Sequence, residues 1–308
     1  MKVLVATQKP FAPAAVKGIE EILVKAGHTV TVLEKYADEG ELIAAVSDVD
    51  AMIVRSDKVT PKVLAAAGNL KIVVHAGSGA GFDNIDLAES KARGVIVENT
   101  PGQNSNAVAE LAIAMMIYMS RNQFTPTAGS EISGKRLGIQ AFGNVGRLVG
   151  KKAEALGMTV LATDPFVPAE KIAEAGAKPV ATVKELYAES DFVSVHIPAT
   201  PETIGSIGYD LITSMPKGAV LVNTARKEVI DEAGLEKALE DRPDLKYVTD
   251  VAPDNLAVLK EKFGLRVFAT PKKMGAQTAE ANMNAGLAAA RQIVAYFAEG
   301  CTRFQVNK

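Results

Sequence analysis

The chain has 308 residues, 48% of them hydrophobic, so it can bury a large core and is expected to form two domains. Its 34 basic and 36 acidic residues nearly balance, which argues against nucleic acid as a partner and favours a small molecule. The most apolar helical segment, 108–119, is too short to cross a bilayer. One cysteine and no recognisable signal peptide lead us to expect a cytoplasmic protein.

Short apolar runs alternate with amphipathic stretches along the chain, which predicts parallel sheets with helices on both faces. Five strands are expected in the first part, at 3–6, 29–33, 51–54, 72–75 and 95–97. Six more are expected later, at 136–141, 159–162, 192–195, 219–222, 246–249 and 266–269. The predicted fold class is α/β, with two doubly wound, Rossmann-like domains and an interdomain cleft.

Two longer helical segments set the expected domain boundaries. The first, 104–121, is rich in Ala, Met, Ile and Leu and separates the two groups of strands. The second, 276–299, closes the chain and can return it to the first sheet. We therefore expect a discontinuous first domain, 1–98 with 283–308, and a second domain, 99–282.

A glycine turn follows the first strand of the second group. In a dinucleotide site, one glycine of this turn lets backbone N–H groups approach the pyrophosphate, and a later one lets the helix pack on the strand. Gly143 and Gly146 occupy these two places. Ala141 stands where a first glycine usually makes the tight turn, so the motif alone is a weak signal.

An acid strengthens this interpretation. Asp164 lies 18 residues after Gly146, at the end of the next expected strand, where a carboxylate accepts hydrogen bonds from the adenosine ribose. A carboxylate there repels a 2′-phosphate, and neither Pro165 nor Phe166 supplies a cation to receive one. The sequence therefore predicts NAD as cofactor rather than NADP.

Polar segments follow four other strands, and ligands of open α/β sheets bind at such carboxyl ends. The segments are 55–56, 77–84, 223–226 and 270–275. Glycine-rich backbone and guanidinium groups both bind carboxylates and phosphates, so these segments predict an anionic substrate. Arg55 can equally be a solvated surface cation, whereas Arg226 follows a buried strand, where an idle charge is costly.

In this order the segments resemble the D-isomer-specific 2-hydroxyacid dehydrogenase family, nearly from end to end. The motifs that carry the resemblance are Arg55-Ser56, Gly79–Asp86, Asn99–Asn104, Ala109–Leu111, Asn223–Arg226 and Thr249–Val251. The resemblance is greatest to members that oxidise D-3-phosphoglycerate with NAD+, giving 3-phosphooxypyruvate in L-serine biosynthesis. It implies a small phosphorylated 2-hydroxy acid as substrate. The sequence shows no zinc-ligand spacing, so we expect no metal.

The resemblance also implies roles for individual residues. Arg226 polarises the substrate oxygen, Arg55 and Ser56 hold the phosphate, and Asp250 holds the nicotinamide carboxamide. The carboxylate end of the substrate is assigned to Ala80, Gly81 and Asn104. The cofactor-binding residues are Gly143, Asn144, Val145, Asp164, His196, Pro198, Thr203, Thr224, Ala225, Asp250 and Gly275.

The chain departs from the family where the base is expected. Pro271-Lys272-Lys273-Met274-Gly275 replaces the usual Pro-His-Ile-Gly, and Pro253-Asp254-Asn255 replaces the usual Glu-Pro. A histidine base needs a carboxylate to hold its tautomer and an amine does not, so losing both together is consistent. Lys273 falls at the histidine position, Lys272 is the rival assignment, and a role for Asp254 stays open. Since free lysine has a pKa near ~10.4, we expect oxidation to be fastest in alkaline buffer.

Two alternative functions remain at this point. The first is a reductase for glyoxylate, hydroxypyruvate or another 2-keto acid, and Arg55 is the main residue that separates it from an enzyme for a phosphorylated substrate. The second is an NAD-sensing, corepressor-like interaction protein on the same scaffold. Segment 104–121 resembles the family's dimer-forming helix, which implies a homodimer.

Overall fold

The computed structural model describes residues 1–77 and 84–308, and the chain folds into two compact units. One unit comprises Met1–Asn104 with Gln277–Lys308, and the other comprises Ser105–Ala276. The chain passes from one unit to the other at two points, and each lies at the start of a helix. The first is just before α5 (Ser105–Ser120), and the second is just before Thr278, the N-cap of α12 (Ala279–Glu299). The predicted boundaries, after 98 and 282, lie a few residues from these positions.

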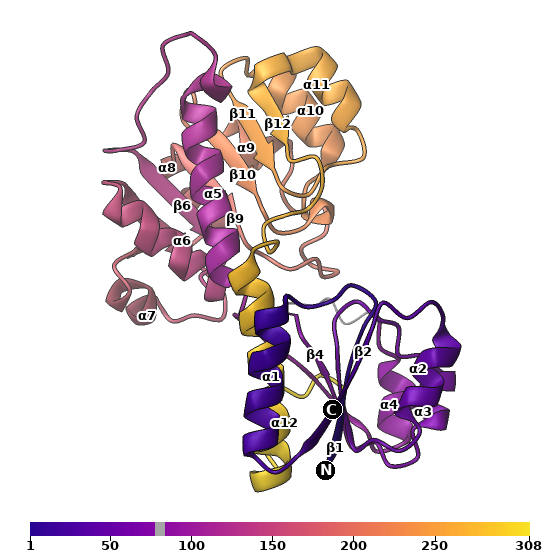
Figure 1. The fold of residues 1–308 in the computed structure, drawn as a ribbon. Helices are drawn as coiled ribbons and strands as arrows, with labels where there is room; N and C mark the ends of the chain where they lie inside the picture. Colours follow the sequence, from indigo (N-terminus) through magenta and orange to yellow (C-terminus); the bar gives the residue numbers. More distant parts are fainter. Residues whose placement is uncertain (78–83) are drawn as a thin grey trace. The chain divides into compact units, whose positions relative to one another are not determined.

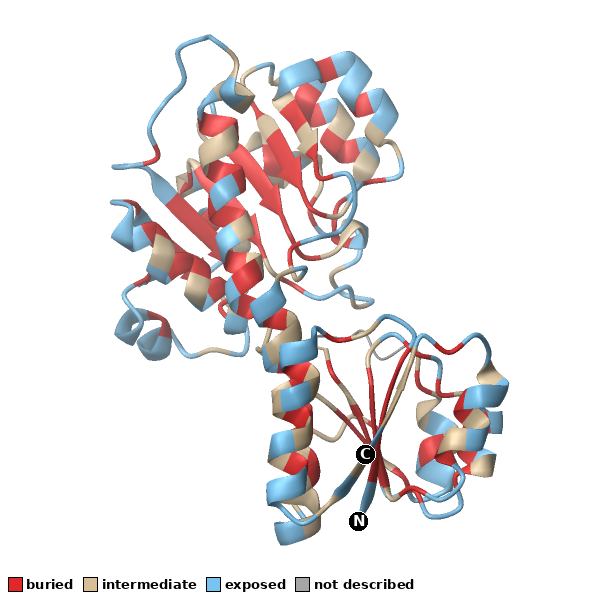
Figure 2. Cartoon of the chain, viewed as in Figure 1, coloured by how far each residue is buried: buried red, intermediate tan, exposed pale blue. Residues whose placement is uncertain are grey.

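Within the described residues the first unit contains a five-stranded sheet in the order β2-β1-β3-β4-β5. All of its pairings are parallel, as the sequence predicts. The strands are β1 (Lys2–Thr7), β2 (Thr29–Glu34), β3 (Ala51–Val54), β4 (Ile72–His75) and β5 (Ile96–Asn99). Residues on both faces of β3 are buried, because helices cover the sheet on each side (Figure 2).

The helices of this unit form two layers (Figure 1). The sheet lies between α1 (Pro13–Lys25) with α12 on one face, and α2 (Glu39–Val46), α3 (Pro61–Ala66) and α4 (Leu87–Ala92) on the other. A Cβ at Gly286 of α12 would lie 2.8 Å from Cδ1 of Ile19 in α1, so glycine permits their close packing. The helix α12 is therefore part of the first hydrophobic core.

The second unit contains a seven-stranded parallel sheet among the described residues, in the order β12-β11-β10-β9-β6-β7-β8. Its strands are β6 (Arg136–Gln140), β7 (Thr159–Thr163), β8 (Lys178–Pro179), β9 (Phe192–Val195), β10 (Val220–Asn223), β11 (Lys246–Thr249) and β12 (Val267–Ala269). Strand β8 was not predicted, because two residues ending in proline give no apolar run. The chain order reverses between β6 and β9, the position at which such sheets bind ligands.

Helices cover both faces of this sheet as well. Segment α5 packs with α6 (Asn144–Ala155) and α7 (Ala169–Glu174) on one face. The opposite face carries α8 (Val183–Glu189), α9 (Tyr209–Thr213), α10 (Glu232–Asp241) and α11 (Leu256–Phe263). None of the helices in the described part of the chain combines the length and apolar character that crossing a bilayer requires.

Candidate active site

The glycine turn between β6 and α6 leaves room for a ligand. Gly143 is the N-cap of α6, and within the described residues no side chain accepts a hydrogen bond from the first-turn N–H groups. A Cβ at Gly143 would have no atom within 4 Å, so the space in front of the helix is open. At Gly146, by contrast, a Cβ would lie 2.3 Å from the carbonyl oxygen of Ala141. The turn thus fits a pyrophosphate in front of a closely packed helix.

Ala141 makes the tight turn in a conformation that alanine rarely adopts. Its φ is +76°, in the region where a Cβ clashes with the backbone and glycine does not. Its N–H donates to the carbonyl of Thr163, 3.0 Å away, which ties the turn to β7. Alanine in place of the usual glycine therefore adds backbone strain to the turn but does not change its shape.

The carboxylate of Asp164 lies against the same turn. It accepts hydrogen bonds from the backbone N–H of Phe142 at 2.7 Å and of Phe166 at 2.8 Å. A carboxylate has about four acceptor positions, so about two remain for ribose hydroxyls. The predicted acid is thus held next to the phosphate turn with capacity to bind a nucleotide.

Loops after β9 and β10 supply further groups that fit a cofactor. The Oγ1 atom of Thr224 is buried and has no hydrogen-bond partner among the described residues. Desolvation lowers the pKa of His196 to about 4, so its ring is neutral at physiological pH, with Nε2 2.9 Å from Oγ of Ser194. Thr203 donates to the carbonyl of Pro198 at 2.6 Å and shapes the loop between them.

Arg226 follows β10 in a turn built by Asn223. The Asn223 side chain accepts from the N–H of Ala225 and donates to the carbonyl of Arg226, both at 2.9 Å. The half-buried guanidinium donates to the carbonyl of Ala225 at 2.8 Å, and no carboxylate among the described residues forms an ion pair with it. A guanidinium without a counter-ion can bind an anionic ligand.

Lys273 lies near Arg226, in the loop between β12 and α12. Its pKa is lowered, first by desolvation and then by repulsion from Arg226, while Asp250 and Glu228 act in the opposite direction. Its side chain retains considerable solvent exposure, so the desolvation comes from a crowded environment rather than from full burial. Asp254 instead pairs with Lys227, with 2.5 Å between Nζ and Oδ1. The positive charge of Arg226 thus acts on the amine of Lys273.

The buried carboxylate of Asp250 anchors the loop that carries the lysines. Its Oδ1 accepts from Oγ1 of Thr270 at 2.8 Å and from the N–H of Met274 at 2.9 Å. Its Oδ2 accepts from the N–H of Gly275 at 2.8 Å and again from that of Met274 at 3.1 Å. Three donors thus share its two oxygens, and the N–H of Met274 contacts both of them.

In the first unit, Arg55 follows β3 and is held by neutral groups. It donates from Nη1 to the carbonyls of Lys9 and Pro10, at 3.0 and 3.2 Å, and from Nη2 to Oδ1 of Asn282, at 2.6 Å. Its guanidinium carbon lies 5.0 Å from the centroid of the Phe11 ring. Burial lowers the pKa of Arg55, an effect that Asp57 opposes, but a guanidinium keeps its charge at neutral pH.

Two residues of this arrangement, Asn282 and Asp57, were not predicted. Asn282 lies 227 residues from Arg55 in sequence, so no local pattern connects them. Asp57 is buried and accepts from the N–H of Gln8 at 2.6 Å and from the hydroxyl of Tyr36 at 2.7 Å. Asp57 lies two residues after Arg55, just beyond a buried strand, and this position in the sequence could have indicated a residue of the site.

The remaining predicted substrate residues differ in what the structure says of them. Ala80 and Gly81 lie outside the described residues. Asn104 is the last residue of the first segment of unit 1, and Ser56 is exposed beside Arg55. Their roles stay predictions.

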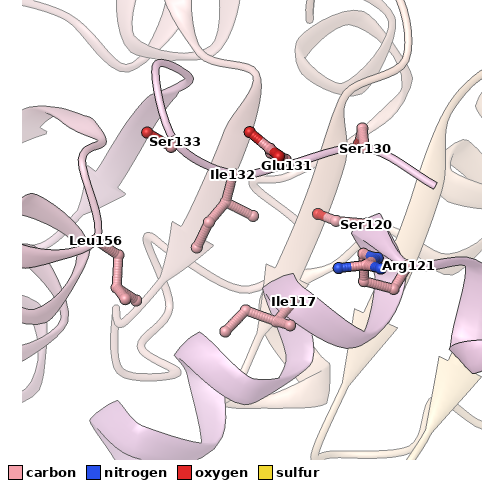
Figure 3. A pocket seen from close by; sticks show the side chains of 8 residues that line it. All are labelled: Ile117, Ser120, Arg121, Ser130, Glu131, Ile132, Ser133 and Leu156. Carbon is pink, nitrogen blue, oxygen red and sulfur yellow. The ribbon is translucent and has the colours of Figure 1, made fainter.

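A shallow hollow of about 270 Å³ lies elsewhere on the second unit (Figure 3). Ser133 precedes β6, Leu156 precedes β7, and Arg121 follows α5. The hollow therefore adjoins the amino ends of the strands, whereas the predicted site residues of this unit follow the carboxyl ends. None of those residues lines it.

Sequence and structure comparisons place the chain in a known family. Residues 108–272 match the model of the D-isomer specific 2-hydroxyacid dehydrogenase, NAD binding domain. This match spans more than half of the chain, so the protein belongs to the D-isomer specific 2-hydroxyacid dehydrogenase family. The NAD-binding domain coincides with the unit that contains the glycine turn and Asp164.

Several individual members of this family are similar to the chain. An NAD+-bound 3-phosphoglycerate dehydrogenase structure from Entamoeba histolytica is 48% identical, with a TM-score of 0.84 over 100% of this chain and 99% of that one. A D-3-phosphoglycerate dehydrogenase from Archaeoglobus fulgidus is 38% identical over 96% of this chain and 57% of its own length. A hydroxypyruvate reductase from Thermotoga maritima is 36% identical over 83% and 87%. The chain spans about half the length of several of the curated relatives.

The strain at Ala141 gives a test of stability. We expect Ala141→Gly to raise the free energy of unfolding by about 0.5–1 kcal/mol, because relief of positive φ (about 1–2 kcal/mol) exceeds the entropy that glycine adds to the unfolded chain. Chemical denaturation measures the change. Ala188→Gly, at an exposed position in α8, is the control and should lower stability by about 1 kcal/mol. Equal losses in both variants would contradict the strain.

Proposed function

We propose that this protein is an NAD-dependent dehydrogenase that oxidises D-3-phosphoglycerate at C2 to 3-phosphooxypyruvate, a step toward L-serine. The single observation that supports this most is the lowered pKa of Lys273 in the NAD-binding unit, caused first by desolvation and then by the positive charge of Arg226. The 48% identical Entamoeba relative, whose printed title is 3-phosphoglycerate dehydrogenase, supports the choice of substrate.

In the proposed reaction the side chains handle charge and protons. Lys273 in its neutral form accepts the proton of the C2 hydroxyl, while Arg226 binds the substrate carboxylate and stabilises the oxygen that becomes a carbonyl. NAD+, when bound, takes the C2 hydrogen with its electron pair. The products are then the keto acid, the reduced cofactor and a protonated lysine, so atoms and charge balance.

Residues of the NAD-binding unit fit the cofactor in these roles. The free first-turn N–H groups of α6 bind the pyrophosphate, and Asp164 binds the adenosine ribose. Thr224 offers its unpartnered hydroxyl. The other proposed contacts come from Asn144, Val145, His196, Pro198, Thr203, Ala225 and Gly275.

Arg55 is proposed to hold the substrate phosphate. Its guanidinium is charged, half-buried and bonded only to neutral oxygens among the described residues. A phosphate would supply the missing negative charge through charge-assisted hydrogen bonds. Ser56, exposed next to it, adds a hydroxyl donor.

A second candidate is reduction of hydroxypyruvate. The Thermotoga relative with that printed name matches 87% of its own length, more than the longer phosphoglycerate dehydrogenases do. The chemistry at Arg226 and Lys273 is the same in both cases. The two candidate functions differ only in whether Arg55 binds a phosphate group of the substrate.

We also propose that the protein is a homodimer through the α5 region. A hollow of about 440 Å³ is lined almost entirely by apolar side chains. Helix α5 contributes Leu111, Ala114, Met115, Ile117 and Tyr118 to its lining. Phe124, which is 69% exposed, also lines it. Burying such a surface against a second copy removes apolar area from water.

The base assignment is tested by substituting each lysine. Lys273→Ala should lower kcat by about 10²–10⁴-fold, because general-base catalysis typically contributes that much, whereas Lys272→Ala should retain activity within a few-fold. In the wild type, kcat/KM should rise with pH as Lys273 loses its proton, with a midpoint below 10.5 because its pKa is lowered. Steady-state rates across pH measure both effects. Full turnover by Lys273→Ala would exclude this lysine as the base.

The phosphate role of Arg55 is tested by comparing substrates. Arg55→Ala should raise KM for D-3-phosphoglycerate by about 10–100-fold, since a charged hydrogen bond contributes roughly 1.5–3 kcal/mol. Turnover of unphosphorylated D-glycerate should change little. The control is Arg93→Ala, whose side chain pairs with Glu89 in the same unit. Equal effects on both substrates would favour the reductase.

The dimer is tested by placing a charge in the apolar hollow. Ala114→Glu, at an exposed position of α5, should convert a dimer into a monomer of 32.4 kDa, because a carboxylate is costly in an apolar interface. Light scattering after gel filtration measures the mass. Ala173→Glu, on the exposed side of α7, should leave the dimer intact. A wild-type protein that runs as a monomer would refute the proposal.

A further inference from the structure

A buried carboxylate joins three loops at one edge of the first sheet. Asp57 is 2% exposed, and its side chain accepts hydrogen bonds from three neutral donors. Oδ1 accepts from the N–H of Gln8 at 2.6 Å and from the hydroxyl of Tyr36 at 2.7 Å, and Oδ2 accepts from the N–H of Arg55 at 3.2 Å. Gln8 follows β1, Tyr36 follows β2 and Arg55 follows β3, and these strands are neighbours in the sheet. Asp57 therefore ties the carboxyl ends of the three strands to one another.

The loop after β1 also binds the guanidinium of Arg55. Nη1 donates to the carbonyls of Lys9 and Pro10, the two residues that come after Gln8. Because the N–H of Gln8 is bonded to Asp57, one carboxylate holds both the backbone of Arg55 and the loop that its guanidinium binds. The arginine is thus fixed at both ends of its side chain.

The surroundings of Asp57 support this arrangement. Lys35, directly before Tyr36, has a φ of +55°, a conformation that is uncommon for a residue other than glycine. Desolvation, and then the hydrogen bond to Asp57, raise the pKa of Tyr36, so its hydroxyl keeps its proton and remains a donor. The side chain of Asn84 donates to the carbonyls of Asp57 at 2.6 Å and of Arg55 at 3.3 Å.

The three contacts require a carboxylate at this position. All three partners are donors, so the side chain must accept on both of its oxygens, which a carboxylate does and an amide does not. In the part of the chain that the structure describes, no cation forms an ion pair with Asp57. A buried carboxylate without an ion pair is costly, and its hydrogen bonds to the loops offset that cost.

The guanidinium of Arg55 keeps donors for a ligand. Its remaining contact is from Nη2 to Oδ1 of Asn282, at 2.6 Å. Nε–H and the second hydrogen of Nη2 therefore have no partner among the described residues. Since the group is a rigid planar fork, any movement of the backbone of Arg55 or of the loop after β1 redirects these donors too.

We propose that Asp57 is a positioning residue that fixes Arg55 for the phosphate of the substrate, by binding the backbone of Arg55 and the loop after β1 to a single carboxylate. The inference rests on the proposed function, because phosphate is the group that Arg55 is proposed to bind. Asp57 does not bind the phosphate itself, since two anions repel each other.

The test is Asp57→Asn, which keeps the shape and removes one acceptor. It should raise KM for D-3-phosphoglycerate by about tenfold, because an amide N–H then meets a backbone N–H and both loops loosen. Since neither the base nor the NAD-binding unit is altered, kcat should stay within about threefold, and KM for D-glycerate should change as little. In a folded variant, an unchanged KM for D-3-phosphoglycerate would overturn the proposal.

Tyr36→Phe is the matched control, because it removes one hydrogen bond from the same carboxylate and leaves the two backbone contacts. It should lower the melting temperature, as Asp57→Asn does, but leave KM for D-3-phosphoglycerate within about twofold. Asp48→Asn, at an exposed residue that pairs with Lys2, controls for the loss of a negative charge in this unit. Equal rises of KM in Tyr36→Phe and Asp57→Asn would show a purely structural role and overturn the proposal.

Amide hydrogen exchange gives a readout that does not depend on turnover. In the wild type, inorganic phosphate should slow exchange at Gln8 and Arg55 by about tenfold at saturation, because a ligand that requires the fixed arrangement stabilises it in return. This measurement needs no variant, so it decides the matter even if Asp57→Asn does not fold. Unchanged exchange at both amides under saturating phosphate would overturn the positioning role. Failure of the wild type to oxidise D-3-phosphoglycerate would instead refute the proposed function.

Discussion

Parallel strand order is the constraint on which this structure depends. Because all strands of a sheet run the same way, their carboxyl ends meet at one edge, and residues far apart in sequence come together there. In the second unit this edge gathers the turn at Gly143, Arg226 after β10, Asp250 after β11 and the loop of Lys273 after β12. The helices on each face bury the strands, so side chains beyond the strand ends are the ones that reach a ligand.

Positive charge without a counter-ion is the second feature that the two units share. Arg55 and Arg226 are each held by neutral carbonyl or amide oxygens, and neither forms an ion pair in the described part of the chain. Half-burying a cation in this way costs solvation energy that a neighbouring carboxylate would normally offset. The arrangement is reasonable for side chains that meet an anionic ligand.

The sequence predicted the strands well because those of a parallel sheet are apolar on both faces. Ala51–Val54, for example, is an apolar run of four residues that is buried throughout and forms β3. The site was predicted where residues follow such strands, as with Asp164 and Arg226. Asn282 could not be found, because its contact with Arg55 depends on how α12 returns to the first sheet. The contacts of Asp250 were equally hidden, since two of its three donors are backbone N–H groups of the loop after β12.

The place of α12 in the first core has a consequence for biosynthesis. Ala285, Ala289 and Ile293 of this helix complete a hydrophobic cluster with Val3 and Val5 of β1. During translation, one face of the first sheet therefore stays incompletely covered until α12 has left the ribosome, whereas the strands and helices of the second unit are synthesised earlier. Ribosome-bound chains that end near residue 276 would then carry a complete second unit and a first unit whose sheet lacks α12. The apolar surface exposed on that sheet is of the kind that makes chains aggregate and that chaperones bind.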